Sequence, residues 1–176
     1  MTMTSSSNSG LDTRDRLIDG AVGLLHAHGY QSVGIKAMCD VAGVQKGSFY
    51  HFFSSKEDLT LAALDRSWEL FRTDVIEPAL AQSDDPAERN GAIRTACLDR
   101  LNKHDSSTNG PHGCMFGRLA ASVTDGEPLL RARLAEIFSE WADRLGGGSE
   151  GWTALADILG RLVLAFTVEI SEVSET

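Results

Sequence analysis

Apolar residues recur along most of the chain at the three- and four-residue spacing of amphipathic helices. Leu17, Ala21 and Leu25 fall on one face of a segment from about residue 13 to 28. Similar patterns predict further helices over residues 35–41, 46–52, 54–76, 84–103, 114–123, 128–145 and 152–170. No stretch alternates long enough between apolar and polar residues to predict a strand. The pattern therefore predicts an all-α protein.

The ends of these helices carry residues that start and stop helices. Gly29 can end the first helix. Residues 54–58, with the sequence SSKED, offer a capping box in either of two registers. Pro78 is expected to end the helix that follows this box. The composition of residues 104–113 predicts a loop, and the glycines within residues 146–151 predict a flexible break.

The composition is that of an ordinary globular protein. Of the 176 residues, 42% are hydrophobic and 23% are charged. No apolar run approaches the ~18–20 residues of a membrane-spanning helix, and the first ten residues lack the basic and apolar segments of a signal peptide. Three scattered cysteines do not form a disulfide framework. We expect a cytoplasmic protein with a disordered polar tail over residues 1–11.

The charge is distributed unevenly along the chain. The net charge of -9 argues against attraction of nucleic acid by the protein as a whole. Residues 1–60, however, hold five Lys and Arg against six Asp and Glu, so almost all of the acidic excess lies in residues 61–176. The first third of the chain can therefore still present a local basic surface.

The most informative stretch is residues 35–50, where two short predicted helices are joined by a turn at Gly43. A glycine at this point can adopt a positive φ. Four apolar residues stand where they would pack the two helices together: Met38, Ala42, Val44 and Phe49. This is the geometry of a helix-turn-helix. The second helix would expose side chains of the kinds that meet phosphates and base edges, namely Lys46, Ser48, Tyr50 and His51.

The segment AGVQKGSFYHFFSSKEDL, residues 42–59, strongly resembles the DNA-binding domain of the tetracycline-repressor-like (TetR) family of bacterial transcription regulators. The resemblance extends over about residues 12–64. It implies a three-helix DNA-binding domain over residues 12–58 and a helical effector-binding and dimerisation domain over residues 59–176. The DNA-contacting residues that we expect are Lys36, Gln45, Lys46, Gly47, Ser48, Tyr50, His51 and Lys56.

Two residues depart from the family pattern. Gly34 stands where the family usually has a Ser or Thr that caps the second helix, so a hydroxyl contact to phosphate is lost. Gln45 stands where Ser is common, and its amide could bond to adenine through two hydrogen bonds. Both departures are compatible with the fold and leave the operator sequence open.

A second segment of the chain also resembles the family. Residues 113–120, GCMFGRLA, are similar to the GC-x-x-x-x-LA start of the sixth helix in many members, and residues 129–141 fit the seventh. The resemblance implies that the later helices form a ligand pocket and a dimer interface. The candidate pocket residues are Trp68, Phe71, Cys114, Phe116, Trp141 and Phe166. The candidate interface residues are Trp152, Leu155, Leu159, Leu162 and Phe166.

The sequence thus predicts a homodimeric, ligand- or stress-responsive repressor that a small molecule releases from double-stranded operator DNA. No enzyme motif, cofactor site or metal site is expected. Two alternatives remain. The first is a redox or electrophile sensor that acts through Cys114, whose position at a predicted helix N-terminus would lower the pKa of its thiol; Cys39 and Cys97 are expected to be buried and inert. The second is a helical binding module that has lost DNA binding.

Overall fold

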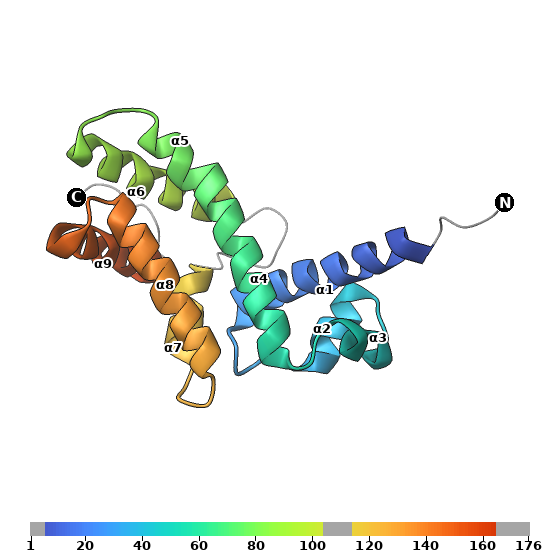
Figure 1. Cartoon of the computed structure of the whole chain (residues 1–176). Helices are drawn as coiled ribbons and strands as arrows, with labels where there is room; N and C mark the ends of the chain where they lie inside the picture. Colours follow the sequence, from blue (N-terminus) through green and yellow to red (C-terminus); the bar gives the residue numbers. More distant parts are fainter. Residues whose placement is uncertain (1–5, 104–113, 165–176) are drawn as a thin grey trace.

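The computed structural model describes residues 6–103 and 114–164, and the regular structure within these ranges is helical. At one end of the molecule lie α1 (Ser6–His28), α2 (Ile35–Ala42) and α3 (Lys46–Phe52). From them α4 (Lys56–Phe71) leads to the other end (Figure 1). The remaining elements are η1 (Arg72–Ile76), α5 (Glu77–Leu80), α6 (Pro86–Lys103), α7 (Met115–Ser122), α8 (Pro128–Arg144) and α9 (Gly148–Leu164). The all-α prediction is confirmed.

The first helix is longer than the sequence pattern predicts. α1 begins at Ser6, so residues 6–11, which were expected to belong to a disordered tail, continue the helix. The packed part of α1 provides the costly helical nucleus, and each residue added to a nucleus costs much less than the first turn. The helix can therefore extend through a polar segment that has no apolar stripe of its own.

Pro78 does not end the helix before it, contrary to expectation. The chain continues from α4 through η1, a π-helical segment, into α5, which ends at Leu80. A proline inside an α-helix lacks an N–H and clashes with the carbonyl four residues earlier. The wider turn of η1 lies directly before α5 and shifts the hydrogen-bond register at this point. We attribute the continuation of the helix past Pro78 to this shift.

The glycine-rich break between α8 and α9 is shorter than predicted. Gly146 and Gly147 make the turn with φ values of 115° and 69°, and α9 already begins at Gly148. The Gly147 N–H donates to the carbonyl oxygen of Ala142 at 3.0 Å. The turn therefore folds back tightly, and α9 packs along α8.

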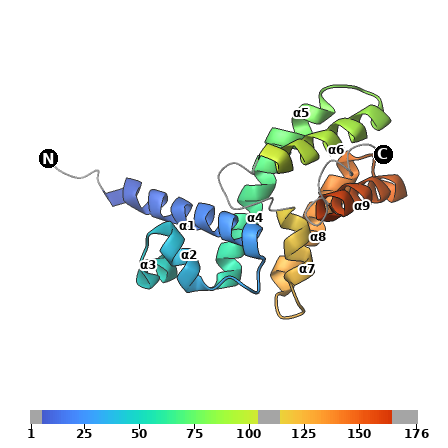
Figure 2. The same ribbon diagram turned by 180° about the vertical axis from the view of Figure 1, so that it is seen from behind.

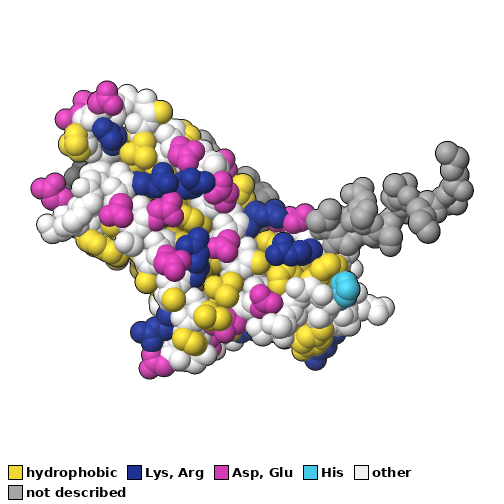
Figure 3. All heavy atoms as spheres, viewed as in Figure 1, with side chains coloured by type: hydrophobic (Ala, Val, Ile, Leu, Met, Phe, Trp, Pro, Cys, Tyr) yellow, Lys and Arg dark blue, Asp and Glu magenta, His cyan; other side chains and the backbone are white. Residues whose placement is uncertain are grey.

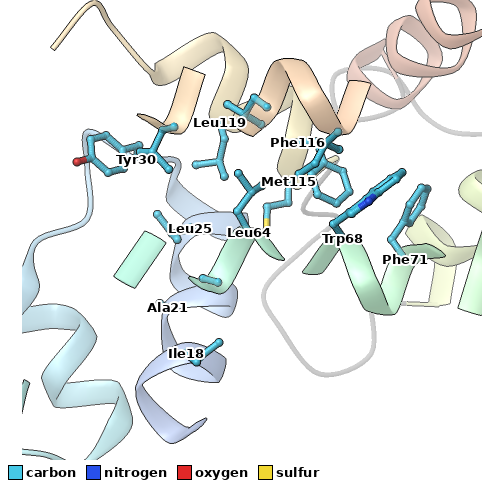
Figure 4. Close-up of a cluster of buried hydrophobic side chains, with 14 of the residues drawn as sticks. Ile18, Ala21, Leu25, Tyr30, Leu64, Trp68, Phe71, Met115, Phe116 and Leu119 are labelled. Carbon is cyan, nitrogen blue, oxygen red and sulfur yellow. The ribbon is translucent and has the colours of Figure 1, made fainter. Parts of the chain in front are cut away.

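The two ends of the molecule share one hydrophobic core. Figure 4 shows side chains from α1, including Leu25, in one cluster with Leu64 of α4 and Leu119 of α7. The cluster continues to Trp68 and Phe71 of α4 and to Phe116 of α7. The domain boundary predicted at residue 58 falls inside α4, which begins at Lys56. This helix packs against both α1 and α8. Figure 2 shows from behind how α4 joins the two groups of helices.

Candidate functional site

The turn between α2 and α3 is fixed from two sides. α2 ends at Gly43, which has a φ of 65°, and the next N–H, of Val44, donates to the Cys39 carbonyl at 2.9 Å. From α1, the Arg16 guanidinium donates to the Ala42 carbonyl at 2.8 and 3.0 Å and to the Gly43 carbonyl at 3.0 Å. This role of Arg16 was not predicted, because nothing local in the sequence links it to carbonyls 26 and 27 positions further along the chain.

α3 has a buried face and an exposed face. Phe49 is completely buried and its ring contacts that of Phe53, with centroids 6.1 Å apart. On the other face, Lys46 and His51 are exposed, and Tyr50 keeps 52% of its surface accessible. A Cβ added to Gly47 would meet no atom within 4 Å. The backbone of α3 is therefore open to close approach from outside.

Several of the predicted DNA-contacting side chains lie on or next to the exposed face of α3. Gln45 is exposed and precedes α3, whereas Ser48 is half-buried. The Lys46 Nζ lies 5.8 Å from the centroid of the Tyr50 ring, within range of a cation–π interaction. On α2, Lys36 is exposed and pairs with Asp40 at 2.6 Å. The hydrogen bond from Lys36 to the Asp40 carboxylate raises the pKa of Lys36.

Lys56 lies in different surroundings. The start of α4 is capped as predicted, because the Ser55 Oγ accepts from the Asp58 N–H at 3.0 Å. The Nζ of Lys56, however, lies 3.8 Å from the centroid of the Tyr30 ring. Burial lowers the pKa of Lys56, and the nearby Glu127 carboxylate opposes this effect. The side chain is thus engaged with Tyr30 in the turn that follows α1.

The face formed by α4 and α8 has a different charge pattern from α3. Figure 3 shows basic and acidic side chains interspersed over these helices. They include ion pairs of Arg133 with Asp65 at 2.6 Å and of Arg144 with Glu140 at 2.9 Å. Opposite charges that neutralise each other in this way leave little attraction for a polyanion.

Four of the predicted pocket residues form one buried aromatic cluster. Trp68, Phe71, Phe116 and Trp141 lie with ring centroids 4.7 to 6.2 Å apart. Trp68 donates from Nε1 to Glu140 at 2.8 Å, but the buried Nε1 of Trp141 has no acceptor among the described residues. The structure therefore brings these four side chains together, and Phe166 lies outside the described residues.

The cysteines do not have the surroundings of reactive thiols. Cys114 stands directly before α7, as predicted, but burial raises its pKa despite hydrogen bonds from the Gly117 and Phe116 backbone. Burial also raises the pKa of Cys97 to about 12, with a smaller contribution from Cys114. Cys39 is buried and its pKa is raised as well, first by burial. At neutral pH these groups remain thiols, which are poor nucleophiles.

The predicted dimer-interface residues on α9 differ in their exposure. Leu155 and Leu162 are buried against the protomer's own helices, and Leu159 is half-buried. Only Trp152 among the described members of the set is exposed, and Phe166 lies outside the described residues. The outward face of α9 instead carries Trp152, Ala156, Gly160 and Val163.

The described ranges contain neither a metal-binding cluster nor a membrane-spanning helix. Within residues 6–103 and 114–164, no group of three or more His, Cys, Asp or Glu side chains is placed to hold a metal ion. In the same ranges no helix combines the length and apolar character that crossing a membrane requires.

Comparison with known proteins gives the family of the chain. Residues 17–63 match the family described as bacterial regulatory proteins, tetR family. The chain is 36% identical to the HTH-type transcriptional repressor KstR of Rhodococcus jostii, with 94% of this chain and 85% of KstR covered. It is 30% identical to the HTH-type transcriptional regulator LmrA of Bacillus subtilis, with 74% and 68% covered. The chain belongs to the TetR family of bacterial regulatory proteins.

Solved TetR-family structures have the same fold. A TetR-family transcriptional regulator from Streptomyces coelicolor superimposes with a TM-score of 0.76 at 24% identity, over 94% of this chain and 89% of that one. AibR, solved in complex with isovaleryl coenzyme A and operator DNA, gives a TM-score of 0.68 at 15% identity, over 89% and 86%. The family model and the relatives KstR and LmrA make this chain a helix-turn-helix transcriptional regulator. Its candidate DNA-binding surface is the outer face of α3.

Proposed function

We propose that this TetR-family regulator represses transcription by placing α3 in the major groove of operator DNA. The observation that carries the proposal is the two-sided character of α3. Phe49 anchors one face in the core, while the other face presents Lys46, Tyr50 and His51. A short helix that is anchored in this way can be held against base edges without moving relative to the domain.

Each exposed group in the proposed surface has a chemical role. The Lys46 ammonium neutralises a phosphate, and the Tyr50 hydroxyl and His51 imidazole can bond to phosphate or to base edges. The amide of Gln45 can pair with adenine. Gly47 lets the backbone approach the DNA, since a side chain is absent at a place that is otherwise open. Lys36 adds a charge from α2, once its ion pair with Asp40 is exchanged for a phosphate.

The regulator acts as a homodimer, because two recognition helices are needed to read the two halves of an operator. We place the partner on the outward face of α9. This face combines a half-exposed Trp152 with the small residues Ala156 and Gly160 and with the exposed Val163. The opposite face of α9 is already buried in the protomer. Apolar residues on two faces of a helix are typical of a helix that is covered by other elements on both faces.

Release from DNA depends on a small apolar molecule that carries a hydrogen-bond acceptor. The aromatic cluster on α4, α7 and α8 supplies apolar surface, and the buried Trp141 Nε1 supplies an N–H that has no acceptor among the described residues. A buried donor without a partner costs about 1–3 kcal/mol, so a ligand that accepts from it gains free energy. The raised pKa values of Cys97 and Cys114 favour this mechanism over a thiol sensor.

The regulator acts by binding rather than by catalysis, in the cytoplasm where bacterial DNA is found.

The proposed role of α3 is tested by DNA binding. A duplex selected from random sequences serves as the operator. We expect Lys46→Ala to lower the slope of log K against log salt concentration by about one unit, because one phosphate contact is lost. Tyr50→Ala should lower the affinity without changing this slope, because it removes a hydrogen bond and no cation.

The control is Arg94→Ala on α6, at the opposite end of the molecule from α3. It removes the same charge and should leave the slope as it is in the wild type. Circular dichroism confirms that each variant is folded. Unchanged binding by both the Lys46 and the Tyr50 variant would refute the assignment of α3.

A further inference from the structure

Three parts of the chain meet in a polar contact between the DNA-binding helices and the helices that follow. Tyr30 lies shortly after the end of α1, Lys56 is the first residue of α4, and Glu127 directly precedes α8. The Lys56 ammonium lies over the Tyr30 ring, and Glu127 attracts it. We refer to Tyr30, Lys56 and Glu127 as the interdomain contact.

Two of its members are fixed by bonds of their own. The Tyr30 N–H donates to the Ser122 Oγ at the end of α7, at 3.2 Å, and its ring lies at the edge of the hydrophobic cluster with the hydroxyl pointing away (Figure 4). Glu127 accepts from the N–H and the hydroxyl of Thr124, both at 2.8 Å, and from the Gln31 amide at 3.3 Å. The bonds from Thr124 lower the pKa of Glu127, which therefore stays ionised at neutral pH.

Lys56 closes the contact from the side of α4. The Lys56 side chain is half-buried, and a cation held over an aromatic ring at 3.8 Å is in direct contact with it. Next to it, the Glu57 carboxylate accepts from the Leu130 N–H in the first turn of α8 at 3.3 Å. The start of α4 is thus joined to the turn after α1 and to the start of α8 by the neighbouring residues Lys56 and Glu57.

We propose that Lys56 is a positioning residue for operator binding, which acts through Tyr30 and Glu127 and does not contact a DNA phosphate. The proposal rests on the proposed function of α3. It assigns Lys56 a role different from the DNA contact that the family resemblance implies. The interdomain contact fixes the orientation of α1 to α3 relative to α7 and α8. A displacement of the turn before α8 would accordingly change how α3 is presented to DNA.

A double-mutant cycle separates the two roles. Lys56→Met removes the ammonium and keeps the length of the side chain, whereas Glu127→Gln removes the charge of the carboxylate and keeps its shape. Both variants and the double variant are titrated with the selected operator duplex over a range of salt concentrations. Hydrogen exchange of the end of α1 is measured on the same proteins without DNA.

We expect each single variant to lower operator affinity about threefold to tenfold, and the double variant to lower it no further than the stronger single one. The slope of log K against log salt concentration should equal that of the wild type in all three. Exchange at the end of α1 should accelerate in each variant. Glu150→Gln, the same substitution in the first turn of α9, should change neither affinity nor exchange.

Two results would overturn the proposal. One is a slope reduced by about one unit in Lys56→Met, with effects that add to those of Glu127→Gln, since this is the behaviour of a phosphate contact. The other is wild-type affinity and exchange in Glu127→Gln. Lys46→Ala tests α3 separately. If that variant binds normally while exchange follows the double-mutant cycle, the proposed function fails and the interdomain contact stands.

Discussion

The start of α9 lies very close to the backbone of α8, and this allows a sharp prediction. A Cβ at Gly151 would overlap the carbonyl oxygen of Ala142 and would lie 3.0 Å from the carbonyl carbon. Both are backbone atoms of α8, so no side chain can rotate out of the way. Gly151→Ala therefore forces the two helices apart at the turn that joins them.

The size of the effect follows from what this separation disturbs. Leu155 and Ile158 of α9 are buried, as is Trp141 of α8, and the two helices pack against each other. Overpacking by one methyl group usually costs about 1–3 kcal/mol, and more when the backbone has to move. We expect a loss of at least about 3 kcal/mol in the free energy of unfolding. For a chain of this size this corresponds to a fall of roughly 6–12 °C in Tm.

The assay is thermal unfolding followed by circular dichroism at equal protein concentrations, since dimerisation makes Tm depend on concentration. The control is Gly91→Ala on α6, where an added Cβ meets no atom within 4 Å. This variant should be as stable as the wild type or gain up to about 1 kcal/mol from helix propensity. A Gly151→Ala protein with the Tm of the wild type would show that α8 and α9 are not in close contact at this point.

Two further predictions concern the dimer and the cysteines. Ala156→Glu on the outward face of α9 should raise the dimer Kd at least about a hundredfold, because it buries an unpaired charge, whereas the control Ala120→Glu on the exposed face of α7 should leave the Kd unchanged. Multi-angle light scattering measures the dimerisation of both variants. An intact Ala156→Glu dimer would show that the interface lies elsewhere. At pH 7, iodoacetamide should modify Cys97 and Cys114 at least about tenfold more slowly in the native protein than in urea, because burial raises both pKa values. If iodoacetamide modified Cys114 rapidly in the native protein and thereby released the operator, Cys114 would be a thiol sensor after all.

Local features of the sequence were sufficient to predict the DNA-binding helices. Gly43 ends α2 because the turn needs a positive φ there, and Ser55 caps α4 through the Asp58 N–H. Both signals depend on residues within four positions of each other, so they can be recognised in one segment. The spacing of apolar residues around Phe49 likewise indicates which face of α3 is buried.

Features that depend on distant segments were not predictable in this way. The stripe on α9 indicated an apolar face, but not that Leu155 and Leu162 would be covered by the protomer itself. Nothing near Arg16 points to the carbonyl groups that it binds across the turn. The surroundings of Lys56 also depend on a distant segment. The motif around Lys56 implies a DNA contact, whereas the fold places the Tyr30 ring beneath its ammonium.

The central claim, that the outer face of α3 meets the operator, is tested most directly by photo-crosslinking. Benzoylphenylalanine replaces Tyr50 in one protein and Leu70, which is exposed on α4, in another. Each protein is irradiated with the selected operator duplex at a concentration that saturates binding, and the modified bases are mapped. We predict adducts with bases in the major groove from position 50 and none from position 70. Adducts from position 70 in the absence of any from position 50 would contradict the account.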